Sequence, residues 1–109
     1  MHEDAEPRVA RNQALFRETN EAIESGQWRG EPSKALRFRC ECSRMDCGEA
    51  VEVTLADYEH VRKFPRRFIV LDCHVDTSLE DIVARAEPYL VVERRGAGGE
   101  VAEASDPRG

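Results

Sequence analysis

Three of the four cysteines in this chain, Cys40, Cys42 and Cys47, lie within eight positions in the spacing C-x-C-x4-C. Thiolates gathered this closely are typical ligands of Zn2+ or of an iron–sulfur centre. A disulfide framework is the less favoured interpretation, because it belongs to exported chains and nothing in the sequence marks export. The cysteine block therefore predicts a small domain that is organised around a metal site.

Three local cysteines leave one position of a tetrahedral zinc site to fill. Cys73 and His74 are the two candidates. They are neighbours on a segment expected to be extended, so they face opposite ways and only one should reach the site. A site of three cysteines and one histidine carries less charge and costs less to desolvate. On the residues alone, both choices remain open.

The composition indicates that a bound metal ion would contribute strongly to the stability of the fold. With 109 residues, 40% hydrophobic and 35% charged, the chain can form one domain with a modest core, in which a structural metal adds most. The sequence lacks a membrane-spanning apolar run and the features of a signal peptide, so we expect a soluble, cytoplasmic protein without a membrane partner. The net charge of −6 disfavours nucleic acid and favours another protein as the partner.

Hydrophobic periodicity predicts an α+β fold in a small single domain, with an N-terminal helix packed on an antiparallel sheet, a metal-binding hairpin and two short helices. The predicted helices cover residues 7–25, 56–63 and 77–86, and the predicted strands cover residues 36–40, 51–55, 68–71 and 89–92. We expect a flexible N-terminus over residues 1–6, the metal-binding domain over residues 7–95 and a disordered tail over residues 96–109. The first helix should pack through Val9, Leu15, Phe16, Thr19, Ala22 and Ile23.

Four sequence blocks, RNQALFRETNEAIE, FRCECSRMDCGEAVEVTLADYEHVR, PRRFIV and PYLVVER, resemble a small family of actinobacterial proteins of undefined function. In that family the C-x-C-x4-C block is followed downstream by Pro-Gly-His, where this chain has Asp72-Cys73-His74. The resemblance implies that the metal ligands are Cys40, Cys42, Cys47 and His74, and that Cys73 is an additional residue. It implies no activity.

Three functional classes follow from these features. The leading hypothesis is a zinc-stabilised protein-interaction or regulatory module without catalysis, because four protein ligands would close the site. The first alternative is a redox or sensor protein in which the same ligands hold a two-iron two-sulfur cluster. The second is a DNA-binding transcriptional regulator that uses the basic residues of segment 62–67.

An enzyme is not favoured by the sequence. The polar side chains of residues 57–60 fan around a short predicted helix and do not converge on a substrate. The glycines of residues 96–99 lie in the predicted tail, where no helix is expected to follow them and form a phosphate-binding loop.

Overall fold

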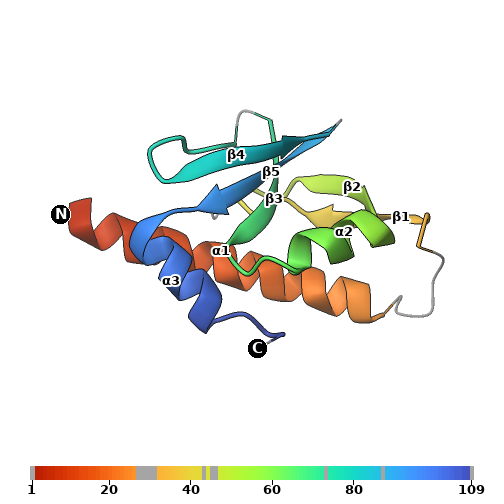
Figure 1. The fold of residues 1–109 in the computed structure, drawn as a ribbon, viewed down its shortest axis with the longest axis horizontal. Helices are drawn as coiled ribbons and strands as arrows, with labels where there is room; N and C mark the ends of the chain where they lie inside the picture. The colour runs from red at the N-terminus through yellow and green to blue at the C-terminus, as the bar shows by residue number, and fades with distance from the viewer. Residues whose placement is uncertain are drawn as a thin grey trace.

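The structure is a computed structural model that describes residues 2–26, 32–42, 44, 47–72, 74–86 and 88–108. The elements in chain order are α1 (His2–Ser25), β1 (Ala35–Arg39), β2 (Ala50–Thr54), α2 (Leu55–Arg62), β3 (Arg67–Leu71), β4 (Glu80–Arg85), β5 (Tyr89–Arg94) and α3 (Gly96–Ala104). Figure 1 shows a long helix, α1, lying along one side of two small sheets. The two shorter helices, α2 and α3, lie near opposite ends of α1. The predicted α+β class is confirmed.

The strands form two antiparallel sheets. β1 and β2 make the predicted hairpin, with Phe38 opposite Val51, and the cysteine segment lies between the two strands. The second sheet has the order β3-β5-β4, with Ile69 of β3 opposite Val91 of β5. β3 and β5 are buried along most of their length, as expected for short runs of continuous apolar residues.

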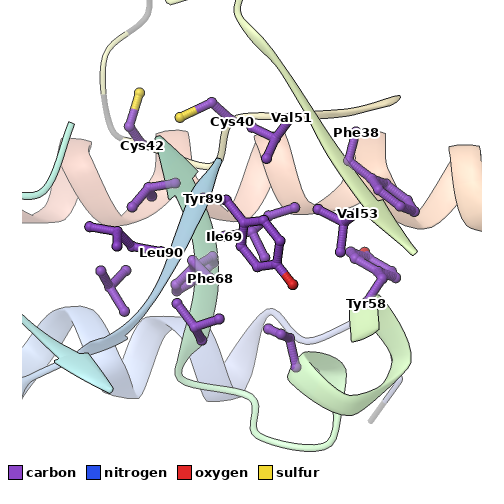
Figure 2. Close-up of a cluster of buried hydrophobic side chains, with 14 of the residues drawn as sticks. Phe38, Cys40, Cys42, Val51, Val53, Tyr58, Phe68, Ile69, Tyr89 and Leu90 are labelled. Atoms are coloured by element: carbon purple, nitrogen blue, oxygen red, sulfur yellow. The ribbon is translucent and has the colours of Figure 1, made fainter. Parts of the chain in front are cut away.

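α2 begins one residue before the predicted start at residue 56. The hydroxyl of Thr54 accepts a hydrogen bond from the backbone N–H of Asp57 at 3.1 Å, which caps the first turn. The helix then buries Tyr58, whose ring stacks on Phe38 of β1 with a centroid separation of 4.3 Å. α2 therefore closes one end of the hydrophobic core, and Cys40 and Cys42 lie at the other (Figure 2).

α1 begins at His2, earlier than the predicted start at residue 7, and its packing face differs from the prediction. Leu15 is 50% exposed, and Thr19 and Ala22 are also exposed. The buried face instead carries Phe16 together with a polar stripe of Gln13, Arg17 and Asn20. The reason is that the surface beneath α1 presents backbone groups and a carboxylate, so hydrogen-bonding side chains fit it better than aliphatic ones.

The helix predicted over residues 77–86 is wrong, because Glu80–Arg85 form strand β4. Residues 76–80 instead make a tight turn: the carboxylate of Asp76 accepts hydrogen bonds from Ser78, and the backbone N–H of Asp76 donates to the carboxylate of Glu80 at 3.0 Å. Pairing with β5 then overrides the local helix signal.

The disordered tail predicted over residues 96–109 is also wrong, since Gly96–Ala104 form α3, which packs against α1 (Figure 1). Gly98 and Gly99 of α3 are buried. A Cβ on Gly99 would lie 2.7 Å from the carbonyl oxygen of Arg94, so glycine permits the close approach. Within the described residues, every helix is too short or too polar to cross a membrane.

Candidate metal centre

The structure brings together Cys40, Cys42, Cys47 and His74, the four ligands expected from the sequence. Their ligand atoms all lie within 4.8 Å of one another. The Nδ1 atom of His74 is 3.4 Å from the Sγ of Cys40 and 3.6 Å from the Sγ of Cys47. The three cysteines are buried and His74 is half-buried, so the group can bind a metal ion that is largely screened from solvent.

The cysteine side of the site is held by the end of the hairpin. The backbone N–H of Cys40 donates to the carbonyl of Glu49 at 3.0 Å, which extends the β1–β2 pairing by one residue. Because Cys40 and Cys42 are two positions apart on an extended segment, they lie on the same face, and Figure 2 shows both at one end of the core. The guanidinium of Arg39 bonds the carbonyl of Cys47 at 2.5 Å and holds the third cysteine close.

The histidine side of the site is held by β3. After the strand ends at Leu71, the backbone N–H of His74 donates to the carbonyl of Leu71 at 3.1 Å and turns the chain toward the cysteines. The backbone N–H of Leu71 also donates to the Sγ of Cys40 at 3.3 Å. The two ligand-bearing segments therefore meet at the site. Cys73, the alternative fourth ligand, lies outside the described residues.

The cysteines differ in their protonation equilibria. A hydrogen bond from Cys40 lowers the pKa of the Cys42 thiol, so Cys42 is the member of this pair that gives up its proton more readily. The same hydrogen bond, followed by burial, raises the pKa of Cys40. Burial also raises the pKa of Cys47. Negative charge on three neighbouring, buried sulfurs is unfavourable without a counterion. A divalent cation bound between them stabilises all three as thiolates.

Two of the separations between ligand atoms fit one tetrahedral ion. With Zn–S bonds of about 2.3 Å and Zn–N bonds of about 2.0–2.1 Å, the S···N edge of a tetrahedron is about 3.6 Å. The distances from His74 Nδ1 to Cys40 Sγ and Cys47 Sγ, 3.4 and 3.6 Å, agree with that edge. The donor set of three sulfurs and one imidazole is also the chemistry that zinc accepts in structural sites.

Sequence reasoning missed a buried carboxylate in the middle of the ligand segment. Glu41 is 1% exposed, and its carboxylate accepts hydrogen bonds from the backbone N–H of Ile69 at 2.9 Å and from the amide of Asn20 at 2.8 Å. Burial raises its pKa to about 7. Side chains alternate along an extended segment, so Glu41 points away from the face that carries Cys40 and Cys42. This alternation would have predicted a buried Glu41 if α1 had been expected to cover that second face.

The basic segment 62–67, the candidate DNA-binding patch, is mostly neutralised. Arg62 is 3% exposed and pairs with Glu21 and Asp106. Arg66 pairs with Glu103 at 2.9 Å and Arg67 with Glu93 at 3.0 Å. Arginines already bound to carboxylates in the same chain are poorly disposed to neutralise phosphates.

The polar residues of α2 do not form a common site. Tyr58 is buried in the core and hydrogen-bonds Glu21, Glu59 binds Arg108, and the ring of His60 meets Phe64 edge-on. The glycines of residues 96–99 do open a helix, contrary to the prediction, but a Cβ on Gly98 or Gly99 would overlap the side chains of Arg94 and Arg66. Close packing of α3 accounts for these glycines.

Comparison of the chain with protein-family models, with curated proteins and with solved structures gave no match.

Proposed function

We propose that the chain is a small zinc-stabilised protein in which Cys40, Cys42, Cys47 and His74 hold one Zn2+ as a structural ion. The observation that supports this most directly is the convergence of four ligand atoms to within 4.8 Å from two separate segments of the chain. The ion would tie the hairpin to the end of β3 and add its binding free energy to a modest core.

Zinc is favoured over a two-iron two-sulfur cluster by the spread of the ligands. A two-iron cluster divides its four protein ligands between two metal atoms, so ligands of different irons lie farther apart than the edges of one tetrahedron. The separations of 3.4 and 3.6 Å involving His74 match the edges around a single ion.

The role that follows is protein interaction or regulation without catalysis. Catalytic zinc sites keep one position for water or substrate, whereas four protein ligands fill the tetrahedron here. In the part of the chain that the structure describes, the polar groups of α2 are occupied by structural contacts. The acidic net charge and the paired arginines of segment 62–67 favour a protein as the partner over nucleic acid.

Elemental analysis of untagged protein, prepared under reducing and oxygen-free conditions, tests the proposal. We expect one zinc per chain, a colourless solution and a large loss of thermal stability when a chelator removes the ion. A brown solution with iron and acid-labile sulfide would establish the cluster instead. A well-folded protein with neither zinc nor iron would overturn the metal site altogether.

A further inference from the structure

We propose that Glu41 is the positioning residue of the metal site: its carboxylate sets the distance between the cysteines of the hairpin and His74 without touching the ion. The inference rests on the proposed function, because it concerns the same four ligands. It assigns a role to the buried carboxylate that lies between two of them in sequence.

Glu41 joins the segment that carries the cysteines to the strand that leads to the histidine. Its backbone N–H donates to the carbonyl of Ile69 at 2.7 Å, and its carboxylate accepts from the backbone N–H of Ile69 at 2.9 Å. One residue thus satisfies both backbone groups of Ile69 on that side of β3. This pair of hydrogen bonds fixes the spacing and the register between the end of β1 and β3.

Few residues separate Ile69, which Glu41 binds, from the metal ligand His74. Two residues after Ile69, the backbone N–H of Leu71 bonds the Sγ of Cys40, and the carbonyl of Leu71 accepts from the backbone N–H of His74. A shift of β3 relative to the hairpin would therefore move His74 away from the sulfurs. The distances from His74 Nδ1 to the Sγ atoms of Cys40 and Cys47, 3.4 and 3.6 Å, leave little room for such a shift.

The second carboxylate oxygen of Glu41 is held by α1. The amide of Asn20 donates to it at 2.8 Å and to the carbonyl of Arg39 at 2.8 Å, while the Asn20 side-chain oxygen accepts from the backbone N–H of Arg39 at 2.6 Å. Since the backbone of Arg39 fixes both ends of the Asn20 amide, the amide cannot turn over without losing hydrogen bonds. Each Glu41 oxygen therefore has a donor of fixed direction, and the carboxylate is locked in place.

Glu41 behaves like the outer partners of other metal sites, which orient the ligands and whose removal lowers metal affinity by roughly 10–100-fold. Glu41→Ala should lower metal affinity because the position of His74 relative to the cysteines would no longer be fixed. Glu41→Gln keeps the acceptor for Ile69 and places an NH2 group against the Asn20 amide, so its affinity should lie between those of Glu41→Ala and the wild type. Glu49→Ala removes an exposed carboxylate from the same loop and is the matched control.

The experiment is a titration of the reduced, metal-free full chain with Co2+, followed by displacement with Zn2+, with the visible bands of Co2+ reporting its ligands. We expect Glu41→Ala to lower the affinity for both ions by roughly 10–100-fold and to shift the Co2+ bands toward those of His74→Ala. Glu49→Ala should retain wild-type affinity and bands.

Wild-type affinity and bands in Glu41→Ala would overturn the positioning role and leave the zinc site standing. An equal loss in Glu41→Gln and Glu41→Ala would also overturn it, because charge and not the bridge to Ile69 would then be responsible. If Glu41→Ala does not fold, Glu41→Gln and its Co2+ bands decide: lower affinity with bands shifted toward those of His74→Ala supports the role, and wild-type affinity or wild-type bands overturn it. A wild-type chain that takes up neither ion would overturn the zinc site and this role together.

Discussion

Arg108 binds Glu59 with both terminal nitrogens of its guanidinium, Nη1 to Oε1 and Nη2 to Oε2, each at 2.8 Å. The same guanidinium bonds the carboxylate of Glu21 at 2.5 Å through Nε. Glu21 belongs to α1 and Glu59 to α2, so the residues after α3 connect two helices that flank the core.

Arg108→Ala should lower the free energy of unfolding by about 0.5–1 kcal/mol, because the ion pairs are partly exposed and screened by solvent. Urea unfolding at low and high salt measures the change, which should shrink in high salt. Arg37→Ala, on the exposed side of β1, is the control and should leave the unfolding midpoint in place. A salt-independent loss in Arg108→Ala would contradict the ion-pair explanation.

Glu24 makes stability depend on pH near neutrality. Its hydrogen bond to Glu59 raises the pKa of Glu24 to about 7, while Arg108 lowers the pKa of Glu59 to about 2. A carboxyl with a raised folded-state pKa binds more protons in the folded chain, so its contribution to stability is present below about pH 4.5 and is lost as pH rises through about 7. Glu24→Gln removes the charge that forms against Glu59 and Glu21.

We expect Glu24→Gln to be more stable than the wild type at pH 8, by on the order of 0.5 kcal/mol, and to show a smaller difference at pH 5. Urea unfolding of both proteins at the two pH values measures this. Glu18→Gln, which changes another, exposed carboxylate of α1, is the control variant. The same difference at both pH values would argue against a shared proton between Glu24 and Glu59.

The metal ligands give the largest expected effects. Cys40→Ser, Cys42→Ser, Cys47→Ser and His74→Ala should each lose zinc during purification. Each should also lose the stabilisation that binding provides, which is about 4 kcal/mol at a free zinc concentration of 1,000 times the dissociation constant. Cys73→Ser should keep zinc and stability. Zinc content and melting temperature of each variant decide, and zinc lost from Cys73→Ser but kept in His74→Ala would reverse the ligand assignment.

Asn20 should be the most sensitive position of α1. Asn20→Ala removes three hydrogen bonds to Arg39 and Glu41 in a buried region and leaves their groups without those partners. The expected loss is about 2–3 kcal/mol of unfolding free energy, measured by urea or heat. Thr19→Ala, at the preceding and exposed residue, should cost less than about 0.5 kcal/mol. Equal losses at the two positions would mean that the interface with β1 is not held by Asn20.

Gly99→Ala should destabilise the chain although alanine is the better helix former by about 1 kcal/mol. The new Cβ would lie 2.5 Å from the Arg66 guanidinium and 2.7 Å from the Arg94 carbonyl, so the overlap should outweigh the gain with a net loss of about 1–2 kcal/mol. Gly26→Ala, where the Cβ meets its nearest atom at 3.5 Å, should be close to neutral. Thermal unfolding compares the two, and a stabilised Gly99→Ala would show that α3 does not pack as closely as described.

The cysteine spacing and the alternation around it were sufficient to predict the hairpin and the meeting of Cys40, Cys42 and Cys47, because both depend on short-range geometry. His74 followed from one unfilled position together with a family resemblance. The errors came from tertiary contacts. β4 looks helical locally and becomes a strand because β5 is available to pair with it. The glycines before Glu100 suggest disorder by composition, yet Gly98 and Gly99 leave room for the side chains of Arg94 and Arg66, a tertiary contact that no local pattern encodes.

The polar surface on which α1 packs affects how the molecule unfolds. Gln13, Arg17 and Asn20 meet carbonyls, an N–H and carboxylates there, with Phe16 as the large apolar side chain among them. A helix that separates from this surface uncovers many groups that water solvates well, so its detachment exposes less apolar surface than that of a helix packed through aliphatic side chains alone. Opening of this helix would then be a reversible event, visible as amide hydrogen exchange in α1 before the buried strands exchange.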